Sequence, residues 1–376
     1  MVETMARLFS TSADESRVFK NQSALMPSFA PSALLHREAQ ILEIASALKP
    51  ALSKARPQNL LIHGPTGTGK TSCARHVISQ LSEYDAKVAC IYVNCWENPS
   101  RQSILSVIAQ KLKEALPRRG LADDEIFGRL IERLKYEKKT LVLVLDEVDR
   151  LMHQGESELL YGLARAQENH GVVIGIIGIT NVPEIFYSLD ERIRSSIRFK
   201  EIAFEKYSPL QLKDILRERA RDSLIPGSYS DEVIALCAAQ GARNNGDARI
   251  AIDALLQSAL KADAMGKNRV EISDVRLVIE RSADASLMKN ANLMGENELL
   301  LMNILKDARD LGKTLTSGEI YSQFNARRAK AGKAAISERQ ILNYIQMFEA
   351  ARMISAQLAD DPNSKSGKTK LIKLIR

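Results

Sequence analysis

Between positions 60 and 72 the chain runs Leu60-Leu61-Ile62-His63-Gly64-Pro65-Thr66-Gly67-Thr68-Gly69-Lys70-Thr71-Ser72. An apolar run meets the pattern Gly-x-x-x-x-Gly-Lys-Thr, and residues with helical spacing follow, which is typical of a phosphate-binding loop between a strand and a helix. Backbone N–H groups must approach phosphate oxygens closely, and this favours glycine at positions 64, 67 and 69. The alternative is a glycine-rich turn before an ordinary helix, but the full eight-residue match in this context argues against it.

Two side chains of this loop have the chemistry that a nucleoside triphosphate requires. Lys70 can reach the β- and γ-phosphates, and the Thr71 hydroxyl can ligate Mg²⁺. The N-terminus of the following helix adds unpaired N–H donors and a partial positive charge. We therefore predict that residues 64–72 bind ATP or ADP together with Mg²⁺.

A second acidic signature follows the apolar run 141–145, which ends in Asp146-Glu147. Asp146 is expected to hold Mg²⁺ through its water shell, and Glu147 to orient or deprotonate the attacking water. Asn181 follows another apolar run, 172–179, where a polar side chain can touch the γ-phosphate. Taken alone, the acidic pair could be a surface turn, and Asn181 could merely cap its strand.

Length and composition set the frame for these motifs. A chain of 376 residues, with 45% hydrophobic and 26% charged residues, is expected to form two or three domains. It shows neither an apolar run of bilayer-spanning length nor the pattern of a signal peptide. The four cysteines have no C-x-x-C or histidine pairing, so we interpret them as buried, reduced thiols of a cytoplasmic protein: Cys73, Cys90, Cys95 and Cys237.

The charge is distributed unevenly. The chain carries +7 overall, and residues 296–376 hold 14 Lys and Arg against 9 Asp and Glu, a net charge of +5. An excess of positive charge in the C-terminal fifth suggests a polyanionic partner for that region.

Apolar periodicity divides the chain into four parts. An N-terminal arm, 1–35, precedes an α/β domain with a parallel sheet, 36–205, which includes a helical excursion at about 98–136. Strands are expected at 60–62, 88–93, 141–145, 172–179 and 197–204, and a helix at 104–116. Helices alone are expected from 208 to 283, with a linker at 284–295. The helical part is assigned to 206–290 and the final domain to 291–376.

The final domain has the pattern of a winged helix. Helices are expected at 299–311, 316–329 and 337–350, and strands at 353–358 and 369–375. We therefore predict an α/β domain with a helical lid, followed by an α+β winged-helix domain.

These motifs resemble those of the AAA+ ATPases and, among them, the archaeal origin-recognition initiators. The resemblance spans about residues 30 to 376, and its more specific part is a Gly-Asp-Ala-Arg helix start followed by a winged helix. The motifs that carry it are Leu35-His36-Arg37-Glu38, the phosphate loop, Leu145-Asp146-Glu147-Val148-Asp149, Gly178-Ile179-Thr180-Asn181, Arg192-Ile193-Arg194-Ser195-Ser196 and Gly246-Asp247-Ala248-Arg249.

The resemblance implies roles for further residues. Asn181 matches the sensor 1 position, and Arg249 matches sensor 2, which approaches the γ-phosphate from the lid. Tyr207 and Arg219 match positions that border the nucleotide, although Tyr207 could equally be a core residue and Arg219 an exposed charge. The position of the trans-acting arginine finger holds Ser195-Ser196 here, which leaves Arg192 and Arg194 as candidates. A monomer that lacks its finger is expected to hydrolyse ATP slowly.

DNA contacts are predicted in two places. The excursion at 98–136 resembles an initiator-specific insertion that contacts DNA, with Arg118 and Arg119 as phosphate partners or as part of a solvated loop. In the winged helix, Ile341, Ile345 and Phe348 form an apolar stripe. Away from it lie candidates for base contacts, namely Arg339, Gln340, Asn343 and Gln346. The predicted phosphate contacts are Arg327, Arg328, Lys330, Lys333, Lys365, Lys368, Lys370 and Lys373.

The resemblance implies a cytoplasmic, nucleoid-associated initiator of DNA replication, a weak ATPase that uses nucleotide as a switch. Its expected partners are double-stranded origin DNA, the replicative helicase and other copies or paralogues, with no membrane. Two other functions remain open. One is a clamp-loader-like or remodelling motor, and the other is a nucleotide-gated transcription regulator.

Overall fold

The computed structural model describes residues 16–27, 29, 31, 33–115, 121–292, 295–350, 353–360 and 368–374. The chain divides into two compact units, Met1–Val275 and Arg276–Arg376. The described part contains no helix that is both long enough and apolar enough to span a bilayer.

The first unit is built on a five-stranded sheet in the order β2-β3-β4-β1-β5, with every neighbouring pair parallel. Its central strands are runs of Leu, Val and Ile that are buried on both faces, as expected for a parallel sheet covered by helices. The strands are β1 (Leu60–His63), β2 (Val88–Asn94), β3 (Thr140–Asp146), β4 (Ile174–Thr180) and β5 (Lys200–Ala203).

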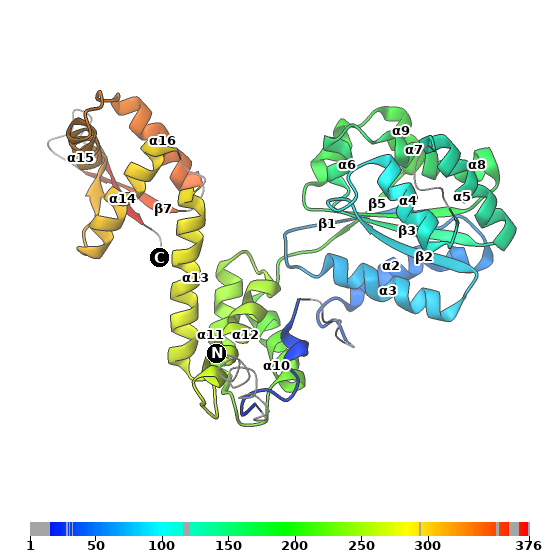
Figure 1. Cartoon of the computed structure of the whole chain (residues 1–376), viewed down its shortest axis with the longest axis horizontal. Helices are drawn as coiled ribbons and strands as arrows, with labels where there is room; N and C mark the ends of the chain where they lie inside the picture. Colours follow the sequence, from blue (N-terminus) through cyan, green and yellow to red (C-terminus); the bar gives the residue numbers. More distant parts are fainter. Residues whose placement is uncertain are drawn as a thin grey trace, which may run out of the picture. The chain divides into compact units, whose positions relative to one another are not determined.

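Helices cover both faces of the sheet, so this part of the chain has three layers (Figure 1). On one face pack α2 (Glu38–Leu48) and α3 (Lys70–Tyr84), which contribute buried residues such as Ile44 and Val77. The other face is covered by α4 (Arg101–Lys111), α5 (Asp123–Glu137), α7 (Glu158–Ala164) and α9 (Glu191–Ile197).

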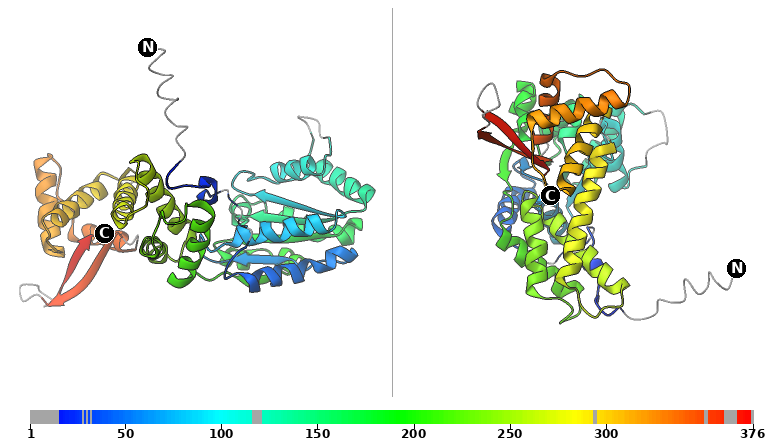
Figure 2. Two further views of the ribbon diagram at one scale, coloured as in Figure 1. Left: turned by 90° about the horizontal axis from the view of Figure 1, so that it is seen from below. Right: turned by 90° about the vertical axis from the view of Figure 1, so that its left-hand side faces the viewer.

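Three helices follow the sheet and form the predicted helical lid: α10 (Pro209–Ser223), α11 (Asp231–Arg243) and α12 (Ala248–Ala264). The start of α10 is fixed by a capping box between Ser208 and Gln211 and by proline at the first turn. The described part of the N-terminal arm, which includes the 3₁₀ helix η1 (Gln22–Leu25), packs against α10 and α12 (Figure 2). Its Val18, Ala24 and Leu25 side chains are buried.

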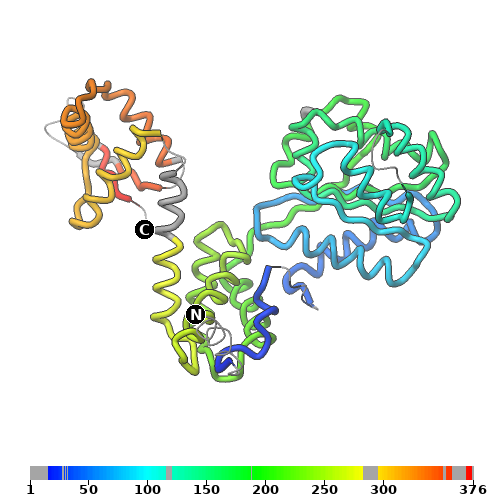
Figure 3. Tube along the Cα trace, in the orientation of Figure 1, coloured from blue at the N-terminus to red at the C-terminus, as the bar shows by residue number. Residues whose placement is uncertain are grey.

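The second unit has the predicted winged-helix architecture, whose trace can be followed in Figure 3. Its helices are α14 (Glu296–Asp310), α15 (Ser317–Lys330) and α16 (Glu338–Ala350). An antiparallel sheet in the order β6-β8-β7 completes it, with β6 (Leu315–Thr316), β7 (Ile354–Asp360) and β8 (Lys368–Leu374). Ile341, Ile345 and Phe348 are buried, which confirms the predicted apolar stripe.

Several predicted boundaries were wrong. The strand expected at 197–204 is only β5, because Ile193 and Ile197 are buried at helical spacing and extend α9 to residue 197. The strand expected at 172–179 is β4, which begins at Ile174. The helix expected at 104–116 is α4, which begins at Arg101 and ends at Lys111. No linker occupies 284–292, since α13 (Ile272–Asn292) continues through it. Short elements were not predicted: η2 (Lys49–Ser53), α6 (Asp149–His153), α8 (Ala166–His170), η3 (Pro183–Ser188) and β6.

Candidate nucleotide-binding site

The loop between β1 and α3 has the backbone conformation that its glycines permit. Gly64, Gly67 and Gly69 have φ values of 141°, 71° and 91°, which residues with a Cβ rarely adopt. The Thr68 hydroxyl donates to the carbonyl of Pro65 at 2.8 Å and closes the loop on itself. Since α3 begins at Lys70 with Gly69 as its N-cap, the unpaired first-turn N–H groups of the helix lie at the end of this loop.

Lys70 is buried, and its ammonium ion lies at the centre of the loop. Nζ donates to the carbonyls of Gly64 and Pro65 at 2.7 and 2.8 Å, and to Oδ1 of Asn181 at 2.8 Å. Burial lowers the pKa of Lys70 from 10.5 to about 8, and the charge of Asp146 opposes this shift. The structure therefore brings together the loop lysine and the predicted sensor residue.

Asp146 ends β3 and is almost fully buried. Its Oδ2 accepts hydrogen bonds from the Thr71 hydroxyl at 2.7 Å and from the Tyr92 hydroxyl at 2.7 Å. The pairing of Asn94 with Asp146 aligns the carboxyl ends of β2 and β3, which explains why a tyrosine of β2 reaches this carboxylate. The two predicted metal ligands, Thr71 and Asp146, are thus neighbours.

Glu147 follows the strand in a left-handed backbone conformation, with φ of 55°. A non-glycine residue in this region is uncommon and, at a functional site, often serves to direct a side chain. Burial, and then the charges of Asp146 and Asp149, raise the pKa of the Glu147 carboxyl. A carboxylate with a raised pKa is suited to accept a proton from water.

Arg249 lies in the first turn of α12 and exposes about two thirds of its side chain. It is held by Asp247, whose Oδ2 lies 3.3 Å from Nη2 of the arginine. Asp247 in turn abuts the phosphate loop, because a Cβ added to Gly67 would lie 1.7 Å from its Oδ1. The Ala248 N–H also donates to the Gly67 carbonyl at 3.1 Å, so the loop contacts the start of α12 directly.

The two residues predicted to border the nucleotide lie in different settings. Tyr207 is buried, and its hydroxyl lies close to the loop, 2.9 Å from the position that a Cβ on Gly69 would occupy. Arg219 instead contacts the N-terminal arm, since its Nη1 donates to the Ala24 carbonyl at 3.1 Å and its guanidinium lies over the Phe29 ring. Burial lowers the pKa of Arg219.

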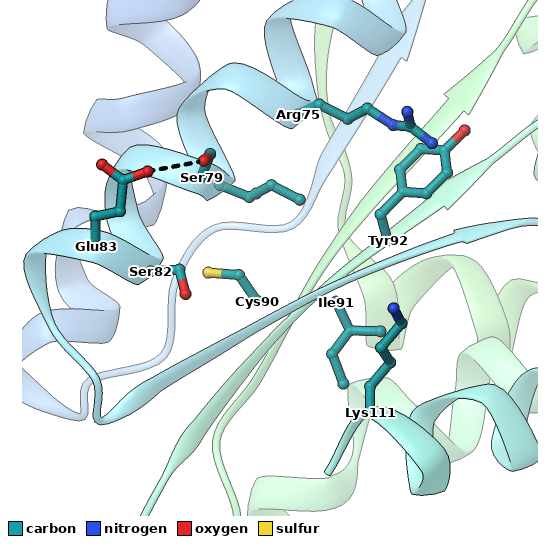
Figure 4. Close-up of a pocket in the computed structure, with 9 residues that line it drawn as sticks. Arg75, Ser79, Ser82, Glu83, Cys90, Ile91, Tyr92 and Lys111 are labelled. Carbon is teal, nitrogen blue, oxygen red and sulfur yellow. Dashed lines mark hydrogen bonds between the residues drawn. The ribbon is translucent and has the colours of Figure 1, made fainter. Parts of the chain in front are cut away.

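A groove of about 580 Å³ runs beside the edge strand β2, between α3 and the end of α4 (Figure 4). Arg75 lies over the ring of Tyr92 at 3.8 Å from its centroid, while Cys90 and Lys111 line the same groove. Burial raises the pKa of Cys90 to about 12, so this thiol stays protonated at neutral pH. One residue of the groove, Tyr92, also contacts the nucleotide site, since its hydroxyl donates to Asp146.

The candidate arginine fingers are both exposed on α9. Arg192 forms an ion pair with Asp190 at 3.1 Å, and Arg194 donates to the carbonyl of Tyr187 at 3.3 Å. Neither of these arginines is bonded to the phosphate loop of its own chain within the described residues. Their role in trans stays a prediction.

The predicted base-reading residues lie on the outer side of α16. Arg339, Asn343 and Gln346 are exposed, whereas the side chain of Gln340 accepts hydrogen bonds from Ser337 at the start of the helix. Gln340 therefore caps its own helix in this structure. Contact of these four residues with DNA stays a prediction.

Several predicted phosphate contacts are paired within the second unit. Arg327 binds Asp307 at 2.7 Å, Lys370 binds Glu349 at 3.3 Å, Arg328 contacts Asn297, and Lys333 contacts Glu296. Lys330 and Lys373 are exposed. Arg118, Arg119 and Lys365 lie outside the described residues, and Lys368 is described only as part of the backbone of β8.

Three residues in contact with the site were given no role by the sequence. Tyr92 contacts Asp146, Asp247 abuts the loop, and Arg37 donates to the carbonyl of Thr68 at 2.9 Å. The strand pairing of β2 with β3 could have indicated Tyr92, and the N-cap position could have indicated Asp247. Arg37 stood within a family motif, but no local pattern indicated its partner.

The residues present fit a magnesium nucleotide. A Cβ at Gly64 would lie 2.2 Å from the carbonyl oxygen of Phe204, so the loop adopts a shape that only glycine allows. A threonine hydroxyl and a carboxylate, 2.7 Å apart, are the oxygen ligands that Mg²⁺ accepts while it keeps several waters. Thr71 and Asp146 would hold the metal, and Lys70 and the loop N–H groups would hold the phosphates.

Residues 54–186 match the AAA domain family, and residues 213–280 match the family of Cdc6 AAA+ ATPase-type lid domains. The chain is 34% identical to ORC1-type DNA replication protein 1 of Sulfolobus acidocaldarius, over 95% of this chain and 90% of the relative. The corresponding protein of Sulfurisphaera tokodaii is 33% identical, over 97% of this chain and 92% of that relative. The structure of the Aeropyrum pernix Orc1 protein in complex with DNA is similar to this chain, with a TM-score of 0.67 and 30% sequence identity. The match covers 96% of this chain and 94% of that protein.

Proposed function

Because this chain belongs to the family of ORC1-type DNA replication proteins, which are AAA+ ATPases, we propose that it is an ATP-dependent replication initiator that binds double-stranded origin DNA. The Orc1 protein of Aeropyrum pernix has been solved in complex with DNA, and it is similar to this chain over almost its whole length. The exposed cationic and polar residues of the winged helix support DNA binding by this chain as well.

The observation that carries the proposal is a pair of hydrogen bonds at the carboxyl edge of the sheet. One joins Lys70 to Asn181, and the other joins Thr71 to Asp146, each at 2.7–2.8 Å. They assemble a loop cation, a polar sensor and a metal-ligating pair from three strand ends, as ATP hydrolysis requires. Thr71 and Asp146 would hold Mg²⁺, which would supply positive charge that neutralises the phosphates.

We propose that the chain hydrolyses ATP slowly and uses the nucleotide as a switch. Glu147, with its raised pKa, would orient the attacking water, while Arg249 would approach the γ-phosphate from the lid. Arg192 and Arg194 are exposed and bonded to residues of their own helix region, so a finger would have to come from another molecule. A missing finger slows related enzymes by about 10³- to 10⁵-fold.

We further propose that the chain helps to recruit or load the replicative helicase and acts with other copies or paralogues. Fast, DNA-stimulated turnover in a stable ring would favour the motor alternative instead. Slow turnover together with ATP-dependent protection of the organism's own origin region would favour the initiator.

The proposed catalytic roles are tested by comparing three variants in calorimetry and in a turnover assay. Lys70→Ala should lose ATP binding, because the buried ammonium ion is the only cation bonded to the loop carbonyls of Gly64 and Pro65 among the described residues. Glu147→Gln should retain ATP binding and lose turnover. The matched control is Glu158→Gln, which alters an exposed glutamate of α7 and should change neither property. Unchanged turnover in Glu147→Gln would remove this residue from the mechanism.

A further inference from the structure

Arg37 is a buried arginine that holds three separate carbonyl groups. It is 4% exposed, and its Nε donates to the carbonyl of Thr68, in the phosphate loop, at 2.9 Å. Its Nη2 donates to the carbonyl of Glu205 at 2.6 Å, in the segment that joins β5 to α10. Its Nη1 donates to the carbonyl of His36 at 3.2 Å. One guanidinium group thus connects the phosphate loop to the segment before α2 and to the segment between β5 and α10.

Aromatic rings complete the surroundings of this guanidinium. It lies over the ring of Tyr207, 4.0 Å from the centroid, and faces the ring of Phe204 at 5.3 Å. Within the described residues no carboxylate forms an ion pair with it, and carbonyl oxygens and aromatic side chains surround its charge. The planar guanidinium of arginine can donate several hydrogen bonds and stack on an aromatic ring at the same time, which the ammonium ion of lysine cannot do.

Among the described residues, the two segments held by Arg37 are the two places where the chain passes between the sheet domain and the lid. The first precedes α2, where His36 has φ of 61° and its Nε2 lies 3.1 Å from Oδ2 of Asp214 in α10. Before this passage the arm is bonded to the lid, through the Lys20 N–H on the Ser223 carbonyl at 2.9 Å. The second passage, residues 204–207, leads from β5 into α10.

We propose that Arg37 is a positioning residue that couples the phosphate loop to both connections of the lid. The inference rests on the proposed nucleotide binding and adds a physical route from the loop to the lid. Phosphates held by the loop N–H groups would fix the Thr68 carbonyl, and the same guanidinium would then fix the Glu205 carbonyl. Occupancy of the loop would thereby restrain the Glu205 backbone of the hinge through Arg37.

Hydrogen–deuterium exchange of the full-length chain, with and without saturating ADP, tests this coupling. In the unaltered protein, ADP should slow exchange in peptides that cover the loop, 64–72, and in peptides that cover the hinge, 204–208. In Arg37→Gln the loop should still be protected at saturating ADP, whereas the protection of the hinge should be lost. Arg37→Lys, which keeps the charge and the aliphatic stem but not the fork, should behave like Arg37→Gln and carries the test should the glutamine variant not fold.

The matched control is Arg56→Gln. Arg56 also bridges carbonyls of two segments, Ala164 at 2.8 Å and Ser196 at 3.2 Å, but it touches neither the loop nor the hinge. This control should keep ADP protection at both sites. Hinge protection that survives in both Arg37 variants would overturn the inference. A lack of ADP protection at the loop of the unaltered protein would instead contradict nucleotide binding itself, so the two failures are distinguishable.

Discussion

The Lys70 ammonium ion shows how a single buried residue can make nucleotide binding depend on pH. Burial lowers its pKa to about 8, so the ion is protonated below that pH and loses its proton above it. Bound phosphates favour the charged form, hence the complex must take up a proton when binding occurs above pH 8. The affinity for ADP should therefore be nearly constant up to about pH 8 and then fall by up to about tenfold per pH unit.

Titration calorimetry of ADP binding between about pH 7 and about pH 9 measures this slope. Lys70→Arg is the appropriate comparison, because a guanidinium remains charged throughout this range. Its absolute affinity will differ, but the fall above pH 8 should be absent. The same slope in both proteins would assign the pH dependence to another group.

For single residues, the sequence predicted those side chains that belong to short motifs. Lys70, Thr71 and Asp146 belong to short motifs in which neighbouring positions share one task, and the structure bonds Thr71 to Asp146 and Lys70 to Asn181. Arg37 and Tyr92 are different, not because of the gaps of 31 and 54 positions to their partners, but because no recognised motif assigns their side chains a task at the site. Their partners are a backbone carbonyl and a carboxylate selected by tertiary packing, which leaves no periodic pattern in the sequence.

The contact between the phosphate loop and the first turn of α12 gives a prediction for a pair of secondary-structure elements. A Cβ at Gly67 would lie 1.7 Å from Oδ1 of Asp247, the residue that caps α12 and holds Arg249. Gly67→Ala should therefore displace the start of the helix, together with Arg249, and lower nucleotide affinity. We expect a loss of more than about tenfold, since a charged hydrogen bond alone contributes about 1.5–3 kcal/mol.

Gly155→Ala is the matched control for backbone strain. Gly155 has φ of 76°, close to the 71° of Gly67, but no atom lies within 4 Å of the Cβ it would gain. Both variants should lose about 1–2 kcal/mol of stability from the left-handed conformation. Only Gly67→Ala should lose nucleotide affinity in calorimetry, and equal affinities for both variants would show that the clash with Asp247 is harmless.

Elements were predictable where one signal dominated. The apolar runs of β3 and β4 could only be buried strands, and the stripe of α16 had clear helical spacing. Residues 191–204 carried two signals, and the helical spacing of Ile193 and Ile197 prevailed over the strand expected to begin at Ile197. The α13 residues beyond 283 mix polar and apolar side chains with little periodicity, so no local signal predicted that the helix would continue to Asn292.

For the molecule as a whole, the excess of charge in the C-terminal fifth indicates where duplex DNA would be held. Four of the cations predicted to contact phosphates are already bonded to side chains of their own unit, at Asp307, Asn297, Glu296 and Glu349. Lys330 is exposed at the end of α15 and has no charged partner among the described residues. A single lysine of this kind contributes affinity without sequence information.

Lys330→Ala should therefore weaken the binding of all duplexes equally and reduce the slope of log K against log salt by about 0.9. Arg339→Ala, on the exposed side of α16, is the matched comparison at a second exposed cation. If Arg339 contacts a base, its loss should relax sequence preference by about 1–3 kcal/mol at one position. Binding of origin and unrelated duplexes over a range of salt separates these effects. An equal loss on both duplexes for Arg339→Ala would make it a phosphate contact, and an unchanged salt slope for Lys330→Ala would remove α15 from the interface.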